Sequence, residues 1–103
     1  MTRPPIHPGG ILTDELADLG MSAAALGRAL HVPSNRITRL RNCQRAITAD
    51  TALRLGHWFG TGPDLWLNFQ KQYELRLAEQ EVGEVIRASV TPRTGLPASI
   101  ADG

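Results

Sequence analysis

Breaks at glycine and proline divide the first two thirds of this chain into short segments, and their spacing constrains the fold more than any other feature. Gly20 is placed to end a first helix, residues 31–33 separate a second from a third, and Gly60 is placed to end a fourth. The segments carry apolar residues at helical spacing, and none shows the alternation of a strand. The sequence therefore predicts short helices joined by short connections.

The expected helices have recognisable beginnings, and the fifth is the longest because no strong breaker occurs before Gly83. The third is expected over 34–42, and the first four lie close together in the sequence. With 103 residues, the chain suits one domain, expected over 1–90, and a Pro- and Gly-rich flexible tail over 91–103. The predicted fold class is all-α, a compact five-helix bundle with a helix-turn-helix. The start signals in chain order are Pro8, Ser22, Pro33 or Ser34, Thr48 and Pro63.

Positive charge is concentrated in the middle of the chain, although the net formal charge is only +1. No acidic residue occurs between Asp18 and Asp50, and four arginines fall within 31–45. Residues 64–87, by contrast, carry five acidic and three basic side chains. Idle helix surfaces usually mix Lys with Glu, so an acid-free basic stretch favours a polyanionic partner such as double-stranded DNA.

The helix expected over 34–42 has a polar outer face. At about 100° per residue, Ile37 and Leu40 point inward, and Asn, Thr and Arg side chains point outward. Such side chains suit base edges in a major groove, and flanking arginines suit phosphates. An ordinary solvated face is the alternative, but it does not explain the missing acids. The predicted DNA-binding residues are Ser34, Asn35, Arg36, Thr38, Arg39, Arg41, Asn42 and Arg45.

The sequence carries no pattern that indicates a metal site, a catalytic site or a membrane segment. The three histidines are scattered and Cys43 is the only cysteine, so we expect no metal site, cofactor or disulfide. No catalytic grouping stands in a recognisable context, so we do not expect an enzyme. The N-terminus lacks the apolar core of a signal peptide, and no apolar run approaches the roughly 20 residues of a membrane span. We therefore expect a cytoplasmic protein without membrane association.

A two-fold dimer is expected, because one short recognition helix reads only a few base pairs and useful specificity needs two half-sites. The basic middle must stay free for DNA, so we place the contact on the fifth helix, which carries more apolar side chains than one inward stripe uses. The alternative is that these side chains, like most aromatic residues around the fourth and fifth helices, complete the core of one protomer. The residues expected at the dimer interface are Phe69, Tyr73, Leu77, Val82, Val85 and Ile86.

Three segments together resemble a known family: "IHPGGILTDEL", "LGRALHVPSNRI" and "ITADTALRLGHWFGTGPDLWLNFQKQYELR". They resemble the HigA-type antitoxins, a branch of the XRE/lambda-repressor-like helix-turn-helix proteins, over residues 6–76. The resemblance implies a five-helix bundle in which 22–30 and 34–42 form the motif. It also implies an antitoxin that represses its own operon as a dimer and binds a RelE/HigB-like toxin that cleaves mRNA on the ribosome.

Two other functions are compatible with the sequence. One is a solo XRE-family transcriptional repressor without a toxin partner, which the absence of a small basic reading frame directly upstream would favour. The other is an enzyme, for instance a ribonuclease resembling the toxin. The all-helical pattern argues against the enzyme, because RelE-like toxins mix strands with helices.

The chain departs from the family pattern at four positions. Ala23 stands where the family commonly has a Gln that touches a phosphate, so one phosphate contact is expected to be missing. His31 and Cys43 stand where Gly is common; His tolerates a positive φ, and the helix end at Cys43 is expected to be less tightly turned. Gly27 replaces the usual Ala at a close helix contact and is small enough to fit, at a helix cost of about 1 kcal/mol.

Overall fold

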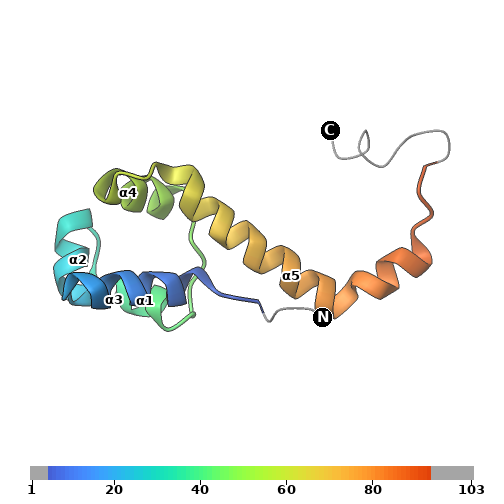
Figure 1. The fold of residues 1–103 in the computed structure, drawn as a ribbon, viewed down its shortest axis with the longest axis horizontal. Helices are drawn as coiled ribbons and strands as arrows, with labels where there is room; N and C mark the ends of the chain where they lie inside the picture. The colour runs from blue at the N-terminus through green and yellow to red at the C-terminus, as the bar shows by residue number, and fades with distance from the viewer. Residues whose placement is uncertain (1–4, 94–103) are drawn as a thin grey trace.

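The computed structural model describes residues 5–93, and this part of the chain contains helices and no strand. The helices in chain order are α1 (Pro8–Leu19), α2 (Ala23–Leu30), α3 (Ser34–Arg41), α4 (Ala49–Phe59) and α5 (Pro63–Ser89) (Figure 1). The predicted all-α fold with five helices and a helix-turn-helix is confirmed. Most of the expected tail, from residue 94 onward, lies outside the described residues.

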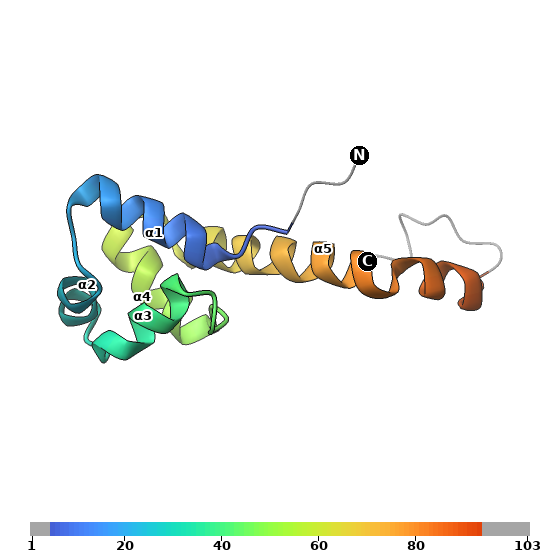
Figure 2. The same ribbon diagram turned by 90° about the horizontal axis from the view of Figure 1, so that it is seen from below.

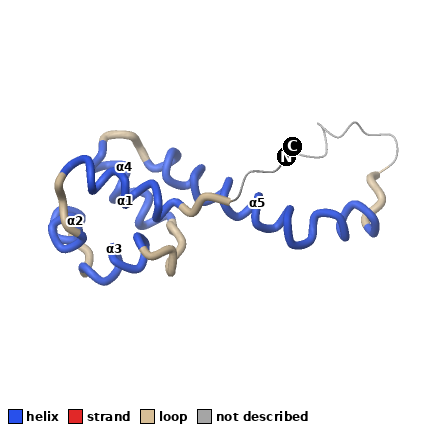
Figure 3. The backbone as a smooth tube through the Cα atoms, turned by 60° about the horizontal axis from the view of Figure 1, so that its bottom comes forward, coloured by secondary structure: helices blue, strands red, loops and turns tan. Residues whose placement is uncertain are grey.

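The molecule is elongated because of α5. The first four helices and the beginning of α5 pack together, and the second half of α5 extends away from them (Figure 2). The principal extents are 53, 24 and 22 Å. Figure 3 shows the same separation along the backbone, with the four short helices at one end and α5 leading to the other. The compact part of the fold is therefore the bundle, and the far half of α5 projects from it.

The helices begin where the local signals place them. Ser22 and Thr48 cap α2 and α4, since their hydroxyl oxygens accept backbone N–H donors three residues further on, at 3.1 and 3.5 Å. α3 begins after Pro33, whose side chain makes no capping bond. The cap of α1 was not anticipated: Nδ1 of His7 accepts the N–H of Gly9 at 2.9 Å. Local chemistry thus accounts for the starts of four helices.

Four of the helices end on residues with a left-handed backbone, namely Gly20 (φ 64°), His31 (φ 60°), Cys43 (φ 60°) and Gly60 (φ 77°). At the first three, the N–H of that residue bonds the carbonyl three positions back and the next N–H bonds the carbonyl five back, over 2.8–3.3 Å. This is the Schellman motif. His31 therefore makes the turn as expected, whereas the expectation of a looser end at Cys43 is wrong, because cysteine takes up the left-handed conformation.

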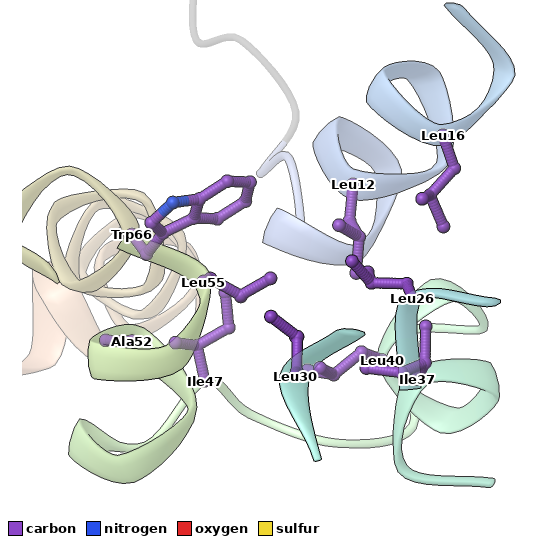
Figure 4. Packing of buried hydrophobic residues seen from close by; sticks show 10 residues of the cluster. All are labelled: Leu12, Leu16, Leu26, Leu30, Ile37, Leu40, Ile47, Ala52, Leu55 and Trp66. Carbon is purple, nitrogen blue, oxygen red and sulfur yellow. The ribbon is translucent and has the colours of Figure 1, made fainter. Parts of the chain in front are cut away.

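The core lies where α1, α2, α3, α4 and the start of α5 meet (Figure 4). Ile37 and Leu40 are completely buried in it, which confirms the predicted inward direction of α3. Trp66 is buried as well, and Phe59 and Phe69 pack against the cluster, but Trp58 stays 39% exposed. The buried apolar side chains are Leu12, Leu16, Leu26, Leu30, Ile37, Leu40, Ile47, Ala52, Leu55 and Trp66.

Two helical glycines fix the ends of α3. Gly9 of α1 lies so close to the last turn of α3 that a Cβ at this position would overlap the carbonyl oxygen of Leu40. Gly27 of α2 lies against the other end, where a Cβ would stand 2.9 Å from the carbonyl oxygen of Val32 and 3.2 Å from Cα of Ser34. The expectation that Gly27 fits this contact is confirmed, and an alanine there would require a shift. α1 and α2 therefore hold α3 from both ends.

Candidate nucleic-acid interface

α2, the turn at 31–33 and α3 form the predicted helix-turn-helix, with α3 at the surface. The outward side chains predicted for α3 and its C-cap, Asn35, Thr38, Arg39 and Asn42, are all exposed. The hydroxyl of Thr38 donates to the carbonyl of Ser34 at 3.2 Å, so the rotamer of Thr38 is restrained. The exposed face of α3 therefore carries an amide, a hydroxyl, a guanidinium and a second amide in a fixed order.

The arginines predicted for this surface do not all lie free upon it. Arg39 is exposed, and Arg41 and Arg45 are half-buried. Nε of Arg45 is buried and has no hydrogen-bond partner among residues 5–93. Arg36 turns toward α4 instead, with its Nη1 3.0 Å from Oδ2 of Asp50. The structure therefore brings Arg39 together with the outward face and directs Arg36 away from it.

Sequence reasoning missed Arg54 and the part played by Asp50. Arg54 donates from Nε to Oδ2 of Asp50 at 3.0 Å and from Nη1 to the carbonyl of Leu30 at 2.8 Å. These hydrogen bonds join the start of α4 to the end of α2. The hydrogen bond from Arg54 is the main reason that the pKa of Asp50 lies below its ordinary value, and Arg36 adds to the effect. The four-residue spacing of Asp50 and Arg54 was a usable signal for the first of these contacts.

A buried glutamine fixes the connection between α3 and α4. Gln70 of α5 is 6% exposed, and its Oε1 accepts the backbone N–H of Ile47 at 2.8 Å. Its Nε2 donates to the carboxylate of Glu74 at 2.9 Å, so both ends of the amide are satisfied. Gln70 follows Trp66 by one helical turn on the buried side of α5. A polar residue within an apolar stripe was therefore the signal by which the sequence could have indicated Gln70.

Two further findings bear on what this surface can do. No cluster of His, Cys, Asp and Glu that could hold a metal ion occurs within residues 5–93. Nor does that range contain a helix of the length and apolar character needed to cross a membrane. The chemistry that the surface does offer is hydrogen bonding and positive charge on a rigidly supported helix, which matches base edges and phosphates.

This fold and surface define a helix-turn-helix protein. No family model matches the chain. An antidote protein of the HigA family from Coxiella burnetii has a similar structure, with a TM-score of 0.87 and 49% identity, covering 88% of this chain and 100% of that one. Antitoxin HigA of Pseudomonas aeruginosa, solved with the higBA promoter, gives a TM-score of 0.82 and 43% identity over 85% of this chain and 97% of that one.

The curated sequences agree with the structures. Virulence-associated protein I of Dichelobacter nodosus is 53% identical over 79 residues, which are 76% of this chain and 73% of that protein. Taken with the structural matches, this similarity shows that the chain belongs to the HigA family of antitoxins. The resemblance seen in the sequence is confirmed, and the relatives named as antitoxins and transcriptional regulators are not enzymes.

Proposed function

We propose that this protein binds operator DNA through α3, represses its own operon and neutralises a RelE/HigB-like toxin that cleaves mRNA. The observation that carries the proposal is the exposed polar face of α3, held from both ends by close glycine contacts. Membership of the HigA family supports it, because a relative was solved with its promoter. Action on operator DNA also accounts for the proposed cytoplasmic location.

Within this proposal, the exposed residues of α3 read bases. Arg39 suits guanine through a bidentate contact, and Asn35 and Asn42 suit adenine. Thr38 keeps its methyl group and an acceptor for base contacts, because its hydroxyl hydrogen is engaged by the helix backbone. These four side chains occupy one exposed face, so their reach is limited to a few consecutive base pairs.

The flanking residues serve the phosphate backbone in the proposal. Arg41 and Arg45 lie at and beyond the C-terminal end of α3, half-buried, so their stems are supported while their charges can reach the surface. Ser34 lies at the opposite end, where its backbone packs against Gly27. Contacts of this kind set the register of the helix on DNA and make the affinity depend on salt.

The direct test is titration of the purified protein against a duplex from its own upstream region and a scrambled duplex of equal length. We expect the upstream duplex to bind at least about 10³-fold more tightly at physiological salt, as specific DNA-binding proteins do. Equal affinity for the two duplexes would contradict operator binding.

Toxin neutralisation is tested separately from DNA binding. The adjacent small reading frame is expressed alone and together with this protein, and growth is followed. Growth arrest that is relieved by co-expression is the expected result. A protein that represses its operon but relieves no arrest would be a solo XRE-family repressor, which is the alternative function.

A homodimer through α5 is also part of the proposal. The expected interface residues fall into an exposed group and a more enclosed group. Val82, Val85 and Ile86 form the exposed group, with exposed fractions of 43%, 65% and 49%. Phe69 instead packs against the core, and the ring of Tyr73 meets that of His7 edge-on at 4.8 Å. Leu77 is half-buried. The exposed group supports a contact with a second copy through the far half of α5, whereas Phe69 and Tyr73 already have partners within the protomer.

A further inference from the structure

One carboxylate oxygen links two arginines from different helices. Oδ2 of Asp50 accepts from Nη1 of Arg36 and from Nε of Arg54, each at 3.0 Å. Asp50 belongs to the first turn of α4, Arg36 to α3 and Arg54 to the middle of α4. Asp50 is also the first acidic residue after the acid-free stretch. It therefore neutralises charge on the recognition helix at the point where the basic region ends.

The carboxylate of Asp50 is held in place by Arg54, which is itself anchored to another helix. Arg54, besides binding Asp50, donates from Nη1 to the carbonyl of Leu30 at 2.8 Å and lies 3.4 Å from that of His31. The end of α2 therefore anchors Arg54, Arg54 anchors Asp50, and Asp50 anchors Arg36. With its side chain 25% exposed, Arg36 is the most enclosed of the three charged side chains.

The energetic consequence concerns DNA more than folding. Asp50 and Arg54 are 57% and 39% exposed, and exposed ion pairs contribute little to stability. A free arginine on a recognition helix, however, binds any phosphate within reach, and such contacts supply the affinity for non-operator DNA. A tethered arginine can contact DNA only where the docked helix brings a phosphate to it.

Resting on the proposed operator binding, we infer that Asp50 is a specificity-determining residue. By holding Arg36 against α4, it lowers affinity for DNA of arbitrary sequence while it leaves the exposed base-reading face of α3 unaltered. Arg54 acts as the positioning residue that gives the carboxylate a single location. The two side chains proposed to read bases, Asn35 and Arg39, form no hydrogen bond or ion pair with Asp50, Arg36 or Arg54 within the described part of the chain.

The test compares operator and non-operator duplexes for the wild type, Asp50→Asn, Arg36→Gln and the double variant. Asp50→Asn should tighten non-operator binding about threefold or more and steepen its salt dependence by about one phosphate contact, a slope change near 0.9. Operator affinity should change by less than this, so that the ratio of the two affinities falls. In the Arg36→Gln background, Asp50→Asn should leave the ratio unchanged.

Asp64→Asn is the matched control. Asp64 occupies the first turn of α5 as Asp50 occupies the first turn of α4, and it forms no ion pair among residues 5–93. Asp64→Asn removes the same charge. It should change the affinities for the operator and non-operator duplexes by less than about twofold, because salt screens the interaction between distant exposed charges. Thermal melts verify that every variant folds. NMR relaxation of Arg36 Nε should show a more mobile side chain in Asp50→Asn than in the wild type.

Several outcomes would overturn the inference. They are an unchanged affinity ratio in Asp50→Asn, an Arg36 side chain equally mobile in both proteins, or an effect of Asp50→Asn that persists without Arg36. A wild-type protein that binds both duplexes equally would overturn the proposed operator binding itself. The two failures are therefore distinguishable in one set of titrations.

Discussion

The end of the molecule that contains α2, α3 and α4 differs sharply from the far half of α5. At the first end, buried leucines, glycine contacts and the hydrogen bonds of Arg54 and Gln70 fix each helix to its neighbours. At the other end, Val82, Val85 and Ile86 are exposed. The ion pair there, Glu79 with Arg87 at 2.6 Å, lies within α5 itself.

This difference fits the two tasks that we propose, base reading by α3 and assembly through α5. A surface that reads bases must hold its side chains in one arrangement before DNA arrives, which requires a rigid support. A helix that projects from its domain gains stability mainly by packing, since isolated helices are marginal in water. The exposed apolar side chains of the far half of α5 therefore support the proposed contact with a second copy of the chain.

The largest expected effect is a difference in the free energy of unfolding between substitutions at the two ends. Leu40→Ala removes a completely buried side chain and should lower the free energy of unfolding by about 2–5 kcal/mol. Val85→Ala removes a side chain that is 65% exposed in the protomer and should cost less than about 1 kcal/mol at concentrations where the protein is monomeric. Chemical denaturation measures both. Equal losses would contradict the contrast between the two ends.

The second prediction concerns assembly. Substituting Val82 and Ile86 by Glu should place like charges in the proposed interface and dissociate the dimer, while the helix content persists. Sedimentation at micromolar concentration should then change from a species near twice 11.2 kDa to one near 11.2 kDa. Leu53→Glu is a suitable control, because Leu53 is 60% exposed on α4, away from this surface. A wild type that sediments as a monomer would refute the dimer.

A smaller effect concerns the ends of the helices around the recognition helix. His31→Gly and Cys43→Gly should each stabilise the protein by about 0.5–1 kcal/mol, because glycine adopts the left-handed conformation without strain. Gly20→Ala is the reverse control: a Cβ at Gly20 would meet nothing within 4 Å, so only backbone strain opposes it. Gly20→Ala should lower the melting temperature. If all three variants melt at the same temperature as the wild type, the left-handed backbone at these positions carries no strain.

The smallest effect is a dependence on pH. Burial lowers the pKa of His7 below its ordinary value of 6.5, and the neutral Nδ1 accepts the capping bond of α1. Between the two pKa values, His7 binds more protons in the unfolded chain than in the folded protein. The contribution of His7 to stability is therefore complete above pH 6.5 and is lost as the pH falls through the folded pKa. His7→Asn keeps a capping side chain without titration and should flatten this part of the stability profile. An identical slope in wild type and variant would exclude His7 as the cause.

The features that could be predicted from the sequence are mostly local. Helix ends at Gly20 and Gly60, caps at Ser22 and Thr48, and the inward direction of Ile37 follow from neighbouring residues, and all were found. Such features depend on turn chemistry and periodicity, which a short stretch of sequence contains in full.

The features that could not be predicted join residues far apart in the chain. Arg54 reaches the carbonyl of Leu30 across 24 positions, and Gln70 reaches Ile47 across 23. The sequence marks Arg36 as a basic residue on the flank of its helix, but only the placement of α4 beside α3 shows that Asp50 engages it. Likewise, nothing in the continuous helical pattern of α5 indicated where it leaves the bundle.

The central claim is that the exposed face of α3 reads operator bases, and the most direct test compares two arginines of that helix. Titrations in graded salt use the operator and a set of single-base variants. Arg39→Ala should weaken operator binding by about 1–3 kcal/mol and abolish the preference at one base pair. Arg41→Ala should weaken all duplexes alike and reduce the salt slope by about one phosphate contact. Identical behaviour of the two variants would contradict the assignment of α3 as the reading surface.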